Sequence, residues 1–362
     1  MDFGLSEDQQ MLDETIRSFL ADRVPIEEVR RLRGEDCPND RAIWQSLAEL
    51  GVTGILVPEA QGGSELSMLD ACLVAQALGH SVTPTPFIGS AVMVPVALRQ
   101  LDHPEIAGWL AGIATGEIAF GVAATEAFSL REEAGISFEG ERLNGKAMMA
   151  WDACGADLIL FPIEGDRIAV IRGDASGLKK TKLVTTDTTR CTSELILDQV
   201  QPEAVLADAS YAISQMLDAG RLALAADSLG AAEAMIEQAV AYAKERKQFE
   251  RLIGSFQAVK HMCAEMISEL EPARSLVWYG AHSFDALPAE TPLMACHALA
   301  HISEIGHEIA SVSTQVHGGI GWTDEQNLHF WFKRIGASRH MLGGPEYLRN
   351  CAAKLQGLAA AS

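Results

Sequence analysis

Hydrophobic positions along the chain follow three successive patterns. Over about the first 114 residues they recur at helical spacing, as Leu12, Ile16 and Leu20 show. Residues 118–202 instead carry short alternating or β-branched runs, which indicate strands. From about Tyr211 the helical spacing returns. The pattern therefore predicts helical, β and helical segments in that order.

The last segment has the strongest helical signal. Small and apolar residues recur every three or four positions along one predicted helix: Leu222, Ala225, Leu229, Ala232, Ile236, Ala239 and Ala243. Because most of them are alanine, neighbouring helices can pack closely. Further helices are predicted over about 255–284, 291–315 and 324–358. Together they predict a four-helix bundle.

Turn sequences divide the middle segment. Asn144-Gly145 and Glu164-Gly165 separate runs of β-forming residues, as hairpin turns do. A small, strand-rich domain of this kind predicts an antiparallel barrel or sandwich. The fold class is thus α+β multidomain. The predicted domains are an N-terminal helical domain (1–114), a middle β domain (115–208) and a C-terminal helical bundle (209–362).

Composition narrows the function classes. The net charge of −21 excludes nucleic acid as an expected partner and argues against docking on an anionic membrane. No stretch approaches a membrane span, and the acidic start MDFGLSEDQQ has no secretory signal pattern. The seven cysteines are scattered without a CxxC pair. We expect reduced thiols and a cytoplasmic location.

Two stretches carry candidate chemistry. Residues 244–260 place Arg246 and Phe249 between two predicted helices, where they suit an anionic, partly flat ligand or form only a solvated charge cluster. Residues 315–325, QVHGGIGWTDE, end one helix with glycines, which permit close approach of backbone to a ligand or simply stop the helix. Thr323-Asp324 can cap the next helix.

The sequence gives little support to a metal site, a dinucleotide-binding motif, a P-loop or a nucleophile elbow. His297, His301, His307 and Glu304 share a helical stripe, but a carboxylate-bridged metal site needs matching pairs from other helices. We therefore expect no metal. The glycines near 318 lack the preceding strand of a dinucleotide fingerprint, and P-loop and nucleophile-elbow sequences are absent.

Taken together, these stretches resemble the acyl-CoA dehydrogenase family. The sequence R-x-Q-F followed by I-G-x-F-Q, and about 55 residues later Q-x-H-G-G-x-G, carries the resemblance. The opening DFGLSEDQQMLDETIRSFL, the segment ELGVTGILVPEAQGG and the pair Thr125-Glu126 follow in the family's order. The resemblance covers the whole chain.

The resemblance implies FAD-dependent oxidation of an acyl-CoA thioester to the 2-enoyl-CoA. A carboxylate removes the α-proton, the β-hydride passes to the flavin, and hydrogen bonds polarise the thioester carbonyl. An electron-transferring flavoprotein is the implied electron acceptor. By matched motifs, the implied cofactor residues are Arg246, Gln248, Phe249, Gln315, Gly318, Gly319, Thr125, Met149 and Trp151, and the implied substrate residues are Arg221 and Ser129.

The chain departs from the family where the catalytic base should be. Members carry a glutamate at one of two positions, which here are Gly343 and Gly220. Glycine cannot act as a base. The β-domain loop also differs, because TEAFSLREE replaces a glycine-rich sequence and introduces Phe128 and Leu130.

One arrangement accounts for these departures. Some members, notably those acting on steroid or bile-acid side-chain CoA esters, resemble α2β2 heterotetramers in which only one chain supplies the base. We hypothesise that this chain is the other subunit. The alternatives are a self-sufficient homotetramer with a displaced base, Glu346 or Asp218, and a non-catalytic interaction scaffold. Glu126 is a further carboxylate near the expected flavin site, and in the family it is structural. The acyl group is not readable from the sequence.

Overall fold

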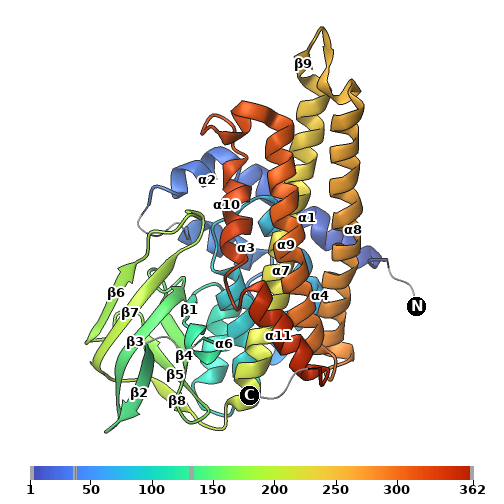
Figure 1. Cartoon of the computed structure of the whole chain (residues 1–362). Helices are drawn as coiled ribbons and strands as arrows, with labels where there is room; N and C mark the ends of the chain where they lie inside the picture. The colour runs from blue at the N-terminus through green and yellow to red at the C-terminus, as the bar shows by residue number, and fades with distance from the viewer. Residues whose placement is uncertain (1–3, 36, 38, 130–133, 359–362) are drawn as a thin grey trace. The chain divides into compact units, whose positions relative to one another are not determined.

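The computed structural model describes residues 4–35, 37, 39–129 and 134–358 (Figure 1). The chain divides into two compact units. The helical unit comprises Met1–Val29, Cys72–Thr83 and Arg221–Ser362, and the sheet unit comprises Arg30–Ala71 and Pro84–Gly220. The helical, β, helical order confirms the predicted fold class, while the boundaries of the three predicted domains stay predictions.

The sheet unit is built on one eight-stranded sheet in the order β6-β7-β3-β1-β4-β5-β8, with β2 paired to β3. Its strands are β1 (Phe120–Val122), β2 (Gly135–Glu139), β3 (Arg142–Trp151), β4 (Leu158–Ile163), β5 (Arg167–Arg172), β6 (Leu178–Lys182), β7 (Thr192–Val200) and β8 (Ala204–Leu206). The pairs are antiparallel as predicted, except that β1 and β4 are parallel. Alternate residues of β3, β4, β5 and β7 form an apolar core on the sheet.

Short helices accompany this sheet in the sequence. They are α2 (Ile26–Leu32), α3 (Arg41–Glu49), η1 (Glu59–Gln61), α4 (Met68–His80), the π-helix η2 (Phe87–Met93), α5 (Val94–Leu98), α6 (Ile106–Ala114) and η3 (Thr125–Ala127). Asp40 caps α3 by accepting hydrogen bonds from the amides of Ala42 and Ile43. No helix in the described part of the chain is both long and apolar enough to span a bilayer.

Three long helices of the helical unit run side by side in Figure 1: α7 (Ser210–Glu245), which belongs to this unit from Arg221 on, α8 (Gln257–Ala286) and α9 (Thr291–His317). The unit also contains the shorter helices α1 (Glu7–Arg23), α10 (His329–Ser338) and α11 (Pro345–Leu355). Helix α9 packs against α8, α10 and α11. Every residue of the predicted α7 stripe is buried, which confirms that pattern.

Two local predictions in this unit were wrong. The single helix predicted over about 324–358 is two helices, because Leu342 and Gly343 have positive φ and Pro345 starts a new helix. Thr323-Asp324 does not cap α10, which begins at His329 with Leu328 at the capping position. The residues between Thr323 and Leu328 form turns, which the preceding glycines at 318–321 do not predict.

Helices α4 and α7 touch backbone to backbone at two glycines. A Cβ at Gly79 would lie 1.9 Å from the carbonyl oxygen of Asp227, and one at Gly230 would lie 1.9 Å from that of Gln76. No real side chain can occupy such positions, so glycine is required at both. This approach fixes α7 against α4 in the helical unit.

A buried ion pair connects α7 to α10. Arg334 donates from Nε to Asp227 at 3.0 Å and from Nη2 at 2.6 Å, and it donates from Nη1 to the Thr83 carbonyl at 3.2 Å. Both charged side chains are nearly inaccessible to solvent, at 3% and 2%. A buried pair of this kind fixes geometry more than it adds stability.

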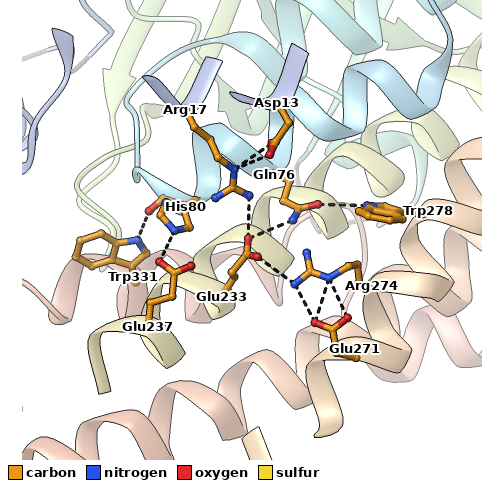
Figure 2. Close-up of polar contacts among 10 residues, drawn as sticks. All are labelled: Asp13, Arg17, Gln76, His80, Glu233, Glu237, Glu271, Arg274, Trp278 and Trp331. Atoms are coloured by element: carbon orange, nitrogen blue, oxygen red, sulfur yellow. Dashed lines mark hydrogen bonds and ion pairs between the residues drawn. The ribbon is translucent and has the colours of Figure 1, made fainter. Parts of the chain in front are cut away.

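A second polar cluster surrounds Glu233 of α7 (Figure 2). Its carboxylate accepts from Arg17 of α1 at 2.9 Å, from Arg274 of α8 at 3.1 Å and from Gln76 of α4 at 3.2 Å. Trp278 in turn donates to Gln76 at 3.3 Å. One carboxylate on α7 thus binds three other helices.

We expect Gly230→Ala to lower the free energy of unfolding by about 3 kcal/mol, because the new methyl must displace the α4 backbone. Gly336→Ala is the matched control, since a Cβ there meets nothing within 4 Å. That control should be neutral or more stable by up to about 1 kcal/mol. Urea denaturation measures both, and equal stability of the two variants would contradict the close α4–α7 contact.

The Glu233 cluster predicts a pH dependence. Burial works to raise the pKa of Glu233, but Arg274 and Arg17 hold that pKa below its ordinary value of 4.5. A lowered folded-state pKa gives stability that is present above the unfolded pKa and lost as pH falls through the folded one. We expect Glu233→Gln to cost about 2–4 kcal/mol at neutral pH, with the difference from wild type shrinking below about pH 4.5. The exposed Glu265→Gln should change stability by less than about 0.5 kcal/mol, and a pH-independent Glu233→Gln effect would contradict the charge-based account.

Candidate functional site

The chain leaves α7 through an exposed hairpin. Strands β9 (Lys247–Gln248) and β10 (Arg251–Leu252) pair antiparallel beyond the ends of α7 and α8 (Figure 1). Its turn residues, Phe249 and Glu250, have φ of 52° and 63°. A turn with two positive φ values normally uses glycine or asparagine, so the backbone at Phe249 and Glu250 is strained. This turn carries an aromatic side chain at its first position. Phe249 is 86% exposed.

The basic side chains of the hairpin differ in their surroundings. Arg251 stacks on the ring of Phe256, with its guanidinium carbon 3.9 Å from the ring centroid. Arg246 and Gln248, the predicted cofactor residues, are exposed. Phe249 meets Phe256 edge to face, with centroids 6.1 Å apart. The hairpin therefore offers an exposed aromatic and an exposed arginine on one protrusion.

The C-terminus of α9 forms the second predicted stretch. Gln315 is exposed in the last turn, and Gly318 ends the helix with φ 67°. The 3-10 helix η5 (Gly318–Trp322) follows. A Cβ at Gly318 or Gly319 would meet nothing within 4 Å. Packing does not explain Gly319, so the open space above it is available to a group from outside this chain.

Stacked rings hold these two stretches together. Tyr242 in the last turns of α7 and His317 at the end of α9 stack with centroids 4.6 Å apart. His317 shares a 2.8 Å hydrogen bond with the Ser313 carbonyl. Burial lowers the pKa of His317 against the opposing effect of that bond, which favours a neutral imidazole at pH 7. The structure thus brings together the two stretches that lie far apart in the sequence.

A pocket of about 370 Å³ continues this surface beyond η5. Its lining combines aromatic, basic, acidic and hydroxyl side chains with a glycine: Thr314, Gly321, Trp322, Thr323, Asp324, His329, Phe332 and Lys333. Trp322 is 76% exposed. The aromatic walls suit a flat group, and the lining carries both signs of charge, since Asp324 lies 2.9 Å from His329. Sequence reasoning missed this pocket because residues 326–333 carry no recognisable motif.

In the sheet unit, Thr125, Met149 and Trp151 lie in one neighbourhood. Glu126 of η3 accepts a 2.8 Å hydrogen bond from the backbone amide of Met148. That bond stabilises a register shift of β3 between Ala147 and Ala150, where Met149 has φ 54°. Trp151 pairs with Val122 of β1. Glu126 therefore stabilises β3, and we do not assign it the role of catalytic base.

Ser129 and the altered loop follow η3. The Ser129 amide donates to the Thr125 carbonyl at 2.9 Å, which keeps Ser129 beside the predicted flavin residues of this unit. Thr125 itself is buried. Leu130, the other bulky residue of that loop, lies outside the described residues.

The turn between α10 and α11 contains Gly343, one of the two predicted base positions. Gly343 has φ +104°, and a Cβ there would lie 2.6 Å from Cδ1 of Tyr347 and 3.4 Å from Cδ2 of Leu348. Any side chain would be strained by its backbone and would collide with the tyrosine ring. The space that a glutamate at this position would enter is filled by Tyr347. Sequence reasoning identified Gly343 and missed Tyr347, which follows it by four residues.

Arg221 lies at the same turn. It is 7% exposed, and its Nε donates to the Leu342 carbonyl at 3.2 Å. Burial and a hydrogen bond with Cys351 raise the pKa of Tyr347, while Arg221 works to lower it. The phenol is therefore neutral at pH 7. An arginine and a neutral tyrosine therefore lie beside Gly343, one of the two predicted base positions.

The two alternative candidates for the base, Glu346 and Asp218, differ in their exposure to solvent. Glu346 is exposed in the first turn of α11, and Gly344 would carry a Cβ 3.7 Å from its Oε2. Asp218 is 2% exposed in α7, two residues before the buried Gly220. Glu304, which shares a helical stripe with His297, His301 and His307, forms an ion pair with Arg349. Among the described residues no cluster of three or more His, Cys, Asp or Glu could hold a metal.

Comparison with known proteins bears on this site. Residues 6–117 match the acyl-CoA dehydrogenase N-terminal domain, and residues 210–356 match the acyl-CoA dehydrogenase C-terminal domain. The acyl-CoA dehydrogenase IpdE2 of Mycobacterium tuberculosis is 32% identical over 345 residues, covering 95% of this chain and 96% of the relative. The chain belongs to the acyl-CoA dehydrogenase family. This is a family of flavin-dependent oxidoreductases, so membership makes the chain an enzyme of that class.

Solved acyl-CoA dehydrogenase structures agree with the fold. A variant of the Tcur3481-Tcur3483 steroid ACAD is 27% identical, with a TM-score of 0.88, over 98% of this chain and 99% of that one. The ChsE4-ChsE5 complex from Mycobacterium tuberculosis is 24% identical, with a TM-score of 0.90, over the full length of both chains. The roles of individual residues in this chain stay predictions.

The contact between Gly343 and Tyr347 predicts a contrast between adjacent glycines. We expect Gly343→Ala to destabilise the acyl-CoA dehydrogenase chain by about 2 kcal/mol, because of its positive φ and the collision with the ring. Gly344→Ala should cost well under about 1 kcal/mol, since its φ is −73°. Adding Tyr347→Ala should recover part of the Gly343→Ala loss in a double-mutant cycle. Additive effects in denaturant unfolding would show that Tyr347 does not fill the position.

Proposed function

We propose that this chain is the subunit without a catalytic carboxylate in a heteromeric, FAD-dependent acyl-CoA dehydrogenase. The observation that carries the proposal is the turn at Gly343. Its positive φ strains any side chain, and a Cβ there would require the Tyr347 ring to shift, while the second family position is the buried Gly220. A homologous chain would supply the glutamate that removes the α-proton.

The relatives support a pair of chains and a bulky substrate. The Tcur3481-Tcur3483 steroid ACAD is named as two proteins together. By this likeness, the substrate of the heteromer is the CoA thioester of a steroid-derived acid, and the enzyme serves steroid degradation. An α2β2 assembly is the corresponding stoichiometry, and an electron-transferring flavoprotein is the acceptor we infer.

The exposed surface of the helical unit fits FAD of a neighbouring subunit. Arg246 on the hairpin can pair with a pyrophosphate oxygen, since guanidinium forks match phosphate geometry. Phe249 offers an exposed ring on the hairpin, and Gln315 offers an amide in the turn before the open backbone at Gly318 and Gly319. In a chain of net charge −21, such local positive charge is needed to attract an anion.

The chemistry divides accordingly. When bound, FAD supplies the hydride acceptor for the β-carbon of the acyl chain. In this chain, Arg246 would neutralise part of the charge of the anionic cofactor and Gln248 would donate hydrogen bonds to it, and Thr125, Met149 and Trp151 would form a wall of the sheet unit beside its flat ring. Arg221 orients the Leu342–Gly343 turn through its bond to the Leu342 carbonyl. Every proton transfer from the substrate is assigned to the partner subunit.

The rival functions predict different measurements. A self-sufficient homotetramer would use Glu346 or Asp218, so Glu346→Gln or Asp218→Asn would slow single-turnover flavin reduction in the lone chain. A non-catalytic scaffold would bind no flavin under any condition. Asp218 is buried in α7, and Glu346 is exposed in the first turn of α11 with its Oε2 3.7 Å from where a Cβ at Gly344 would lie.

The deciding experiment compares the chain alone with the chain co-expressed with a homologue that carries the glutamate. We expect the pair to co-purify, to show flavin absorption bands and to form enoyl-CoA. The lone chain should turn over slower by on the order of 10²–10⁴-fold, the usual contribution of a general base. In the pair, Arg246→Gln should lower FAD occupancy, whereas Arg251→Gln, whose side chain stacks on Phe256, should retain it. Full FAD loading and turnover by the lone chain would refute the proposal.

A further inference from the structure

A pair of thiols in the sheet unit has no part in the proposed dehydrogenase function. Cys37 lies between α2 and α3, and Cys191 immediately precedes β7. The two side chains share a hydrogen bond, although 153 residues lie between them in the sequence. Cys191 is 1% exposed, and Cys37 is partly exposed.

Several contacts hold the segment that carries Cys37 against the sheet. Lys182 at the end of β6 donates to the Glu35 carbonyl at 2.8 Å, and Asn39 donates to the Asp152 carboxylate at 2.6 Å. A Cβ at Gly155 would lie 2.9 Å from Cys37 Sγ. The Cys37 thiol therefore lies against the backbone at Gly155, in a segment that is bonded to the sheet at Glu35 and Asn39.

The position of Cys191 is fixed by the same group of residues. The Asp152 amide donates to the Cys191 carbonyl at 2.8 Å, so Asp152 contacts both the segment of Cys37 and Cys191. Asp152 thus holds both segments next to each other, with the two thiols within hydrogen-bonding reach, and proximity of this kind is the first requirement for a disulfide.

We propose that Cys37 and Cys191 form a redox-active dithiol, in which Cys37 is the residue attacked by oxidants and Cys191 resolves it to a disulfide. Hydrogen peroxide is the oxidant class that suits a partly exposed thiol beside a buried one. Intracellular disulfides are usually transient and redox-sensing, and this pair fits that use.

The electrons and atoms balance over two steps. The Cys37 thiolate attacks one peroxide oxygen, the O–O bond breaks, and the other oxygen leaves as water after taking a proton, giving a sulfenic acid. Cys191 sulfur then attacks the Cys37 sulfur, the S–O bond breaks, and the hydroxyl leaves with the Cys191 proton as a second water. The two thiols lose two electrons, and peroxide gains them.

The electrostatic surroundings agree with these roles. The hydrogen bond from Cys191 lowers the pKa of Cys37 to about 6, with smaller contributions from the Asn39 and Gly155 amides and the charge of Lys182, against burial. The hydrogen bond with Cys37, burial and the nearby Asp152 and Cys154 raise the pKa of Cys191. Thiolate is the reactive form, so the first attack falls to Cys37.

The test treats the folded full chain with one equivalent of hydrogen peroxide, alkylates remaining thiols, and maps tryptic peptides without reduction. We expect peptide 34–41 linked to peptide 191–221, with the link removed by dithiothreitol. Alkylation of Cys37 should follow a pH midpoint near 6 rather than near 9. The oxidised chain should melt several degrees higher, since the bond closes a long loop.

Three variants make the assignment specific. Cys154→Ser should keep the link, Cys37→Ser should abolish it, and Cys191→Ser should leave a sulfenic acid on Cys37 that dimedone traps. Peptide 34–41 recovered unlinked from the wild-type chain, or linked to peptide 147–167 that carries Cys154, would overturn the proposal. These readouts need neither FAD nor the partner, so they stand apart from a failure of the dehydrogenase proposal.

Discussion

The close contact between α4 and α7 is the constraint on which the helical unit depends. Gly79 and Gly230 bring each helix within reach of a carbonyl of the other, at spacings that exclude any Cβ. Residues of α7 near this contact bind the other helices of the unit. Asp227, whose carbonyl faces Gly79, holds Arg334 of α10 through its carboxylate, and α10 leads directly into the turn with Gly343. Glu233, six residues after Asp227 in α7, binds α1 and α8. The position of the turn therefore follows from how α7 is held.

Periodicity was enough to predict the elements that depend on burial along a single segment. The α7 stripe is buried as predicted because a helix in the middle of a bundle buries every apolar face. Gly318 ends α9 with a positive φ, as a glycine after a helical run predicts. The break between α10 and α11 was missed, although Gly343 and Pro345 are visible in the sequence. The apolar spacing on both sides of the break is compatible with one helix, and only tertiary packing makes Leu342 adopt a positive φ.

Contacts between distant segments could not be predicted from one sequence. Nothing in the spacing of Tyr242 and His317 indicates that their rings stack, yet this contact places the two predicted cofactor stretches together. The same holds for Cys37 and Cys191, which the sequence presents as two scattered thiols. Family motifs gave the positions of Gly343 and Arg221. They could not show that Tyr347 fills the space beside Gly343 or that Arg221 binds the Leu342 carbonyl.

The structure of the turn changes what the absent glutamate means under the proposed function. A glycine with open space beside it could regain a carboxylate by one substitution. Here a carboxylate would meet a positive φ and the Tyr347 ring at once, so at least two changes are needed and the first alone destabilises the turn. The residues that face outward are under no such conflict, because Gly319, Gln315 and Arg246 lie on exposed backbone. In the proposed heteromer, the dependence on a second chain for proton abstraction is therefore a property of the packing around Gly343 as well as of the missing residue.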